Sequence, residues 1–190
     1  MEQTVVTHEI EEETYTPRIY VASLGDYVAG RLHGRWINAD QGFDAIRDQI
    51  NAMLAESPEP IAEEWAIHDY ENFGSLRLSE YEDLAKVAEV AFLITEHGLM
   101  FAALVSHFGE ASNVDEARRY MEEGYRGKFD SLPDYAQETV EDCFGSELKK
   151  LPEFIRYHID WEGIAHDMEL SGDVFTIEDD GQVHVFDGHI

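Results

Sequence analysis

Histidines and carboxylates are the residues of this chain that could bind a metal ion or catalyse hydrolysis, with nine His among 41 Asp and Glu. His68 and Asp69 are neighbours in a segment that alternates like a strand, so their side chains should point to opposite faces of a sheet. His158 and His166 lie two turns apart on one predicted helix, roughly 12 Å of rise and too far for one metal ion to bridge. We therefore expect no catalytic site, no metal site and no cofactor. A metal-dependent enzyme built on His68, His158 and His166 is a disfavoured alternative.

Short catalytic motifs are also missing from the sequence. It has no HExxH, GxSxG, GxxxxGK[ST] or GxGxxG pattern and no EF-hand loop. The single cysteine, Cys143, follows Glu141 and Asp142, an acidic setting that disfavours a reactive thiolate. We expect Cys143 to be a small buried apolar residue, and a chain with one cysteine fits a reducing cytoplasm.

Carboxylates recur instead at helical spacing. Asp134, Glu138, Glu141 and Asp142 share one face of a helix predicted over residues 132–145, which contains no Lys or Arg. Two further stripes, each on one predicted helix, repeat every seven residues: Glu82, Glu89 and Glu96, and Glu153, Asp160 and Asp167. Seven helical residues rise about 10.5 Å, close to the roughly 10.2 Å covered by three phosphates of one DNA strand.

These stripes define a candidate DNA-like acidic surface, for which an ordinary solvated surface is the alternative. Its candidate residues are Glu82, Glu89, Glu96, Glu122, Glu123, Asp134, Glu138, Glu141, Asp142, Glu153, Asp160, Asp167 and Glu169.

The formal net charge of -28 is spread along the chain rather than confined to a tail. Residues 1–14 carry -5, residues 15–60 only -2, and residues 151–190 carry -9. Such a chain repels nucleic acid and anionic membranes and attracts basic proteins. Its charge equals that of about 48 Å of duplex, whereas a compact globule of this length would be roughly 40 Å across. An elongated shape or a dimer would suit DNA-like charge better.

Hydrophobic patterning predicts an α+β fold. Strands within residues 17–38 and 63–73 enclose a helix at 43–55, which makes a small α/β unit at about 18–75. Helices follow, with capping boxes at Ser79/Glu82 and Asn113/Glu116, a buried helix at 98–108, and helices that begin at Ser131 and Pro152. Alternation around Asp-Asp-Gly in residues 173–187 predicts a C-terminal hairpin. No segment is long and apolar enough to be a signal peptide or a membrane span.

In several segments the sequence resembles the ArdA antirestriction proteins, which are DNA mimics that inhibit type I restriction-modification enzymes. The matching segments follow the family's order and cover most of residues 19–180: IYVASLGDYVAGRLHGRWI (19–37), EEWAIHDYENFG (63–74), EYEDLAKVAEVAFLITEHG (80–98), LVSHFG (104–109), ARRYMEEGYRGKFDSLPDYAQE (117–138) and DMELSGDVFTIE (167–178).

The resemblance implies an elongated, curved, noncatalytic protein of three small domains, usually a homodimer. It implies binding in the DNA groove of the methyltransferase core formed by modification and specificity subunits. We expect an acidic tail at 1–17, an α/β domain at 18–78, a helical middle domain at 79–123 and a C-terminal α+β domain at 124–190.

The family's antirestriction motif corresponds to residues 103–117 and is associated with the dimer contact. Its candidate residues, Leu104, Val105, His107 and Phe108, could equally be ordinary core. Two alternatives stay open for the whole chain: an acidic interaction protein for another basic DNA-binding partner, and a salt-adapted domain that mimics nothing.

Overall fold

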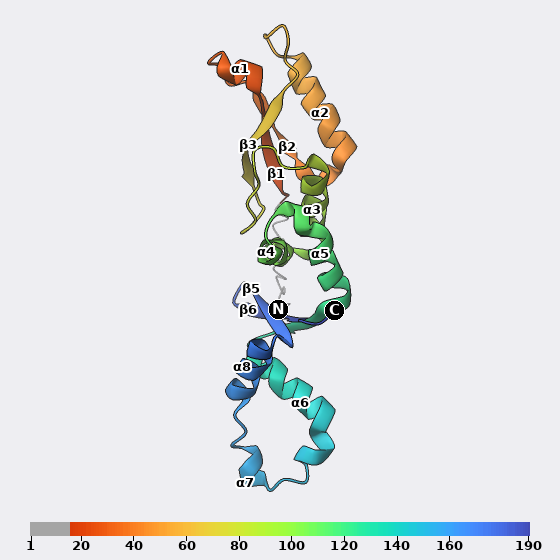
Figure 1. The fold of residues 1–190 in the computed structure, drawn as a ribbon, viewed down its shortest axis with the longest axis vertical. Helices are drawn as coiled ribbons and strands as arrows, with labels where there is room; N and C mark the ends of the chain where they lie inside the picture. Colours follow the sequence, from red (N-terminus) through yellow and green to blue (C-terminus); the bar gives the residue numbers. More distant parts are fainter. Residues whose placement is uncertain (1–15) are drawn as a thin grey trace, which may run out of the picture.

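The computed structural model describes residues 16–190 and shows an elongated molecule, in which the chain runs from one end to the other and its last residues return to the middle, where the C-terminus lies (Figure 1). Most of the acidic tail expected at 1–17 lies outside the described residues. Its last residue, Pro17, is buried, and the Pro17 carbonyl accepts a hydrogen bond from the Ala39 N–H at 2.8 Å. Pro17 therefore contributes to the fold.

A three-stranded antiparallel sheet forms one end of the molecule, with the strand order β2-β1-β3 (Figure 1). Its strands are β1 (Arg18–Ser23), β2 (Gly34–Asn38) and β3 (Trp65–Glu71). Helix α2 (Phe43–Ala55) has the predicted bounds and buries Ile46, Ile50 and Met53, which share one face. The predicted α/β unit is confirmed, although short helix α1 (Leu24–Val28) and the 3-10 turn η1 (Ala39–Gln41) were not foreseen.

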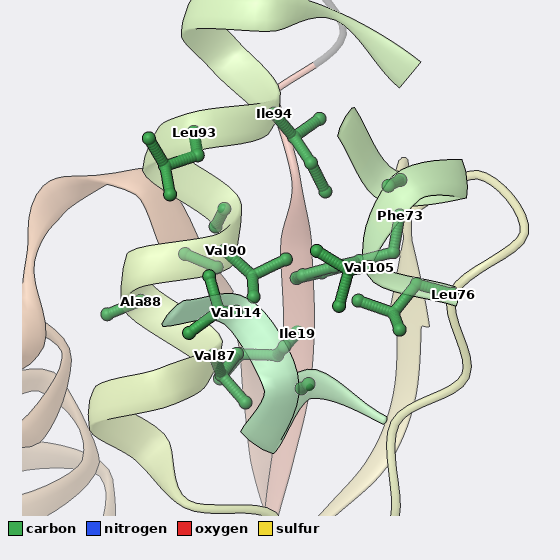
Figure 2. Packing of buried hydrophobic residues seen from close by; sticks show 14 of the residues in the cluster. Ile19, Phe73, Leu76, Val87, Ala88, Val90, Leu93, Ile94, Val105 and Val114 are labelled. Atoms are coloured by element: carbon green, nitrogen blue, oxygen red, sulfur yellow. The ribbon is translucent and has the colours of Figure 1, made fainter. Parts of the chain in front are cut away.

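Three helices form the middle of the molecule: α3 (Leu84–His97), α4 (Leu99–Phe108) and α5 (Val114–Arg119). The 3-10 turn η2 (Ala111–Asn113) precedes α5, and the π-helical turn η3 (Tyr120–Gly124) follows it. Figure 2 shows side chains of α3, including Val87, Val90 and Ile94, packed with Val105 of α4 and Val114 of α5. The same buried cluster includes residues of the first sheet and reaches Ile177 and Phe186, so one apolar core links the two sheets.

Both predicted capping boxes are wrong. Helix α3 begins later than expected because Asp83 is its N-cap, accepting the Ala85 N–H at 2.9 Å. Glu82 therefore precedes the helix, although it accepts the Ser79 N–H at 3.2 Å. The Asn113 side chain makes no cap; its amide donates to the Phe108 carbonyl at 2.9 Å, at the end of α4.

The second antiparallel sheet has the order β4-β6-β5, from β4 (Tyr125–Phe129), β5 (Val174–Asp179) and β6 (Gln182–Asp187). The predicted hairpin is confirmed: Asp180 and Gly181 have φ of 48° and 72°, as a tight turn with two left-handed residues requires. Strand β4 was not predicted, because it is short and a register shift near Gly127 interrupts its pairing with β6. Helices and two sheets together confirm the α+β class.

Three helices extend beyond this sheet to the far end of the molecule (Figure 1). Ser131 caps α6 (Leu132–Leu148) as predicted, but α6 continues past Gly145 after a kink at Phe144. The single helix predicted from Pro152 is wrong: the chain forms α7 (Glu153–Arg156) and α8 (Trp161–Ser171). The break occurs because the Asp160 side chain accepts the Gly163 N–H at 2.9 Å and starts a new helix.

Substitution of Gly188 should destabilise the second sheet. A Cβ atom at Gly188 would lie 1.9 Å from the Gly172 carbonyl oxygen. This oxygen belongs to the backbone, so it cannot rotate away as a side chain could. We expect Gly188→Ala to lower the free energy of unfolding by about 1–3 kcal/mol, measured by urea denaturation. Gly145→Ala, where no atom lies within 4 Å of the added Cβ, is the control and should cost nothing.

Buried His184 predicts a pH effect on stability. The Tyr125 hydroxyl lies 2.8 Å from Nδ1, and within residues 16–190 the other ring nitrogen, Nε2, has no hydrogen-bond partner. Burial lowers the pKa of His184 below its usual range; nearby Lys128 adds to this and Asp179 opposes it. The fold thus favours the neutral ring, and this stability is present above about pH 6.5 and lost as the pH falls below that value.

We expect the urea midpoint of the parent to decrease when the pH is lowered from 7 to 5. The midpoint of His184→Phe should decrease less, because the Phe ring cannot bind a proton. Parallel midpoint profiles for the two proteins would show that His184 does not contribute this effect.

Candidate acidic interface

Four carboxylates of α6, the α6 stripe (Asp134, Glu138, Glu141 and Asp142), lie on one face of the helix as its spacing predicts. All four are exposed, and together with Gln137 they line one shallow depression. The Gln137 amide donates to Glu141 Oε1 at 2.8 Å. No Lys or Arg of residues 16–190 forms an ion pair with the stripe.

Helix α6 is held at its first turns rather than along its length. The Ser131 hydroxyl accepts the Asp134 N–H, Pro133 lies in the first turn, and Ala136 is the only residue that α6 buries. The ring of Tyr135 packs edge-on against Phe129, with centroids 5.1 Å apart. The prediction that Cys143 is buried is wrong: Cys143 is exposed, and α6 buries no residue beyond Ala136.

Of the three carboxylates expected to form a stripe on α3, one forms ion pairs with basic side chains and one lies outside the helix. Glu89 accepts hydrogen bonds from Lys86 at 3.3 Å and pairs with Arg118 of α5. Glu82 is partly buried and lies before the helix, so Glu96 is the one stripe member that is exposed on α3. Helical spacing could not reveal Arg118, because the tertiary fold brings it to Glu89 from another helix.

The stripe expected on one C-terminal helix is divided between three places. Glu153 opens α7, Asp160 is the N-cap of α8, and Asp167 lies within α8, so the regular seven-residue rise predicted for them is wrong. All three are nevertheless exposed. Glu153 accepts a hydrogen bond from the Tyr157 hydroxyl at 3.2 Å, and Asp160 uses one oxygen for its cap.

The other candidates are also at the surface. Glu122 and Glu123 lie on the π-helical turn η3, and Glu169 lies on α8 near Thr176, whose hydroxyl donates to it at 3.4 Å. The candidates that are exposed and without a Lys or Arg partner among the described residues are Glu96, Glu122, Glu123, Asp134, Glu138, Glu141, Asp142, Glu153, Asp160, Asp167 and Glu169.

Most basic side chains are occupied by carboxylates elsewhere in the chain. Nine of the 13 Lys and Arg side chains form ion pairs within residues 16–190. Arg31 bridges buried Asp26 and Glu59, a charged group that the sequence analysis missed. A hydrogen bond from the Ser57 hydroxyl, supported by Arg31, lowers the pKa of Asp26 below its usual range. Asp26 therefore serves the fold and is not part of the exposed acidic surface.

The segment expected at a dimer contact lies partly in the core of a single chain. Leu104 and Val105 are fully buried within it. His107 is exposed and its ring stacks on Phe175 of β5, with centroids 4.5 Å apart, while Phe108 stacks on Tyr120 at 4.9 Å. Of the four candidate residues, only His107 and Phe108 offer surface to a second chain, and both already join α4 to the second sheet.

The histidines show no arrangement for metal chemistry in the part of the chain that the structure describes. His68 packs edge-on against Tyr27 with centroids 5.0 Å apart, and Asp69 accepts the Tyr70 N–H. His158 and His166 do not share a helix, since His158 precedes α8. Residues 16–190 contain no group of three His, Cys, Asp or Glu side chains that could hold a metal ion. Among the helices of these residues, none could cross a membrane.

The fold and this surface define an elongated acidic protein whose exposed groups can accept hydrogen bonds and form ion pairs with a basic partner. The sequence model of the family described as Antirestriction protein (ArdA) matches residues 19–182. The chain therefore belongs to the ArdA antirestriction family, which implies an antirestriction function, a restriction-modification enzyme as partner, and no known enzymatic activity. No curated protein matches the sequence.

Proposed function

We propose that this protein mimics B-form DNA and competitively blocks the DNA-binding groove of a type I restriction-modification enzyme. The groove belongs to the methyltransferase core of modification and specificity subunits. The single observation that carries the proposal is that exposed carboxylates without a Lys or Arg partner among residues 16–190 occur on α3, η3, α6, α7 and α8 of an elongated molecule, whose shape Figure 1 shows. These carboxylates would take the place of phosphates and pair with Lys and Arg of the groove.

Helix α6 alone carries fewer charges than an equal length of DNA. The α6 stripe covers eight helical steps, roughly 12 Å of rise, a length over which duplex DNA carries about seven charges. Four carboxylates supply only part of that density. Helix α8 packs against α6 and adds exposed Asp167 and Glu169, so the two helices together approach the density of DNA.

The proposal includes a cytoplasmic homodimer of three-domain chains, with units at 18–78, 79–123 and 124–190, that binds no nucleic acid itself. Two elongated chains end to end would present a longer acidic surface than one. Ion pairing of this surface should release counterions and weaken with added salt.

A competition assay tests the proposal. A labelled duplex that contains the target site is bound to a purified type I methyltransferase, and this protein is then added. We expect full displacement of the duplex near equimolar inhibitor at low salt, and weaker displacement as salt rises. Failure to displace duplex from any type I methyltransferase, combined with capture by a histone-like protein, would favour an acidic protein for a different basic partner.

A further inference from the structure

The segment of residues 149–160, which we call the α7 strap, contributes no buried residue to the fold. It contains α7 and lies at the far end of the molecule, between the ends of α6 and α8 (Figure 1). Helix α6 buries no residue beyond Ala136, and its backbone leaves helical geometry at Phe144. Segments with few buried apolar contacts move at a small cost in free energy. The strap can therefore move relative to α6 without disruption of the core.

A groove of about 630 Å³ lies between α6, the α7 strap and the start of α8. Two basic side chains, Lys149 and Arg156, line it together with three carboxylates, Glu141, Asp142 and Glu153. Within residues 16–190, neither of these basic side chains forms an ion pair. Opposite charges thus line one groove without direct contact between them.

The charges are divided between the two sides of this groove. Helix α6 contributes Glu141 and Asp142, two members of the α6 stripe, and α7 contributes Arg156. Lys149 is the residue that follows α6, and Glu153 is the first residue of α7. Movement of the strap toward α6 would bring Arg156 to the stripe and Glu153 to Lys149. Both encounters join opposite charges, so electrostatic attraction favours closure of the groove.

We infer that the α7 strap closes against α6 at low salt, with Arg156 paired to Glu141 or Asp142 and Lys149 paired to Glu153. The closed strap competes with the basic groups of a partner for part of the α6 stripe. Exposed ion pairs are individually weak, so closure is reversible and a surface with several Lys and Arg side chains opens the strap. Closure is a property of the chain alone, and only its effect on binding rests on the proposed function.

Two spin labels on the full chain measure closure. Cys143, which is exposed and is the single cysteine, takes one label on α6, and Phe154→Cys takes the other on α7. Neither position lines the groove, and Phe154 is 69% exposed, so the labels leave the groove free. Pulsed electron paramagnetic resonance gives the distance between the labels at about 0.01 M and about 1 M salt. Between these concentrations the screening length falls from roughly 30 Å to roughly 3 Å.

We expect the distance between the labels to be shorter at low salt than at high salt. In the same labelled background, the groove variant Lys149→Gln with Arg156→Gln should keep the longer distance at both concentrations. The matched control, Arg47→Gln with Lys150→Gln, removes the same charge from side chains that do not line the groove, and it should close like the labelled parent. A distance that does not change with salt, or a groove variant that closes like the control, would overturn the inference.

Closure also predicts a change in affinity, measured by calorimetry on the unlabelled proteins. At low salt the groove variant should bind a purified type I methyltransferase about two- to fivefold more tightly than the charge-matched control, because its stripe has no strap to displace. Equal affinities of these two variants would contradict the competition between strap and partner. If none of the proteins binds a type I methyltransferase, the proposed function fails, while a salt-dependent distance in the labelled parent still supports closure.

Discussion

Replacing the α6 stripe with Asn and Gln should weaken binding to a type I methyltransferase by roughly a hundredfold at low salt. Each removed carboxylate is one lost ion pair, so the slope of log affinity against log salt should become shallower by about 3–4 for the four residues. The isolated protein should become slightly more stable, by a few tenths of a kcal/mol per like-charge pair removed. Calorimetry over a salt series and urea denaturation measure the two effects.

A variant with the same change in net charge provides the control. Glu56, Glu71, Glu116 and Glu147 are exposed carboxylates that already pair with Arg35, Arg18, Arg119 and Lys150. Their replacement with Gln should leave affinity within a few-fold of the parent, because these groups are occupied. Equal losses in the two quadruple variants would show that net charge, rather than the α6 stripe, determines binding.

Loss of the Phe186 ring should have the largest effect on stability. Phe186 in β6 is fully buried, and its ring stacks on Phe175 and lies beside Tyr125, with centroid distances of 5.1 and 5.2 Å. We expect Phe186→Ala to cost about 3–5 kcal/mol of unfolding free energy, enough to unfold a marginally stable domain. Denaturant unfolding followed by circular dichroism measures it.

Phe144→Ala is the matched control, because Phe144 is 56% exposed and outside the core. It should change the unfolding free energy by less than about 0.5 kcal/mol. A Phe186→Ala protein as stable as the parent would mean that the second sheet does not depend on the core it shares with α4 and α5.

Elements with a strong period could be predicted from the sequence. Helix α2 has apolar residues at every helical turn, and the C-terminal hairpin has clear alternation around a turn with two left-handed residues. Strand β4 was missed because it has only five residues and Gly127 stands at its centre, so the alternation leaves only Tyr125 and Phe129 as apolar side chains. The break before α8 was not predicted because the apolar pattern of the sequence continues across Asp160. The helix is interrupted there because the Asp160 side chain accepts one hydrogen bond, from the Gly163 N–H, and so caps a new helix.

The candidate site was predictable where it depends on one helix and unpredictable where it depends on two. Exposure of the α6 stripe follows from the spacing and from the small area that α6 buries through Ala136. The neutralisation of Glu89 depends on Arg118, whose approach is set by the packing of α5 on α3. Exposed Cys143 shows the opposite error: apolar character alone does not bury a residue when no neighbouring element covers it.

The pairing of basic side chains has a consequence for how the protein behaves at high concentration. A chain that imitates the ligand of basic grooves would also attract its own Lys and Arg, and copies would associate with one another. Within residues 16–190, carboxylates of the same chain pair with nine of the 13 basic side chains, so few of these side chains remain to bind the acidic surface of a neighbour. Each pair adds little stability on its own, but together the pairs reduce nonspecific association between the acidic and basic groups of different copies.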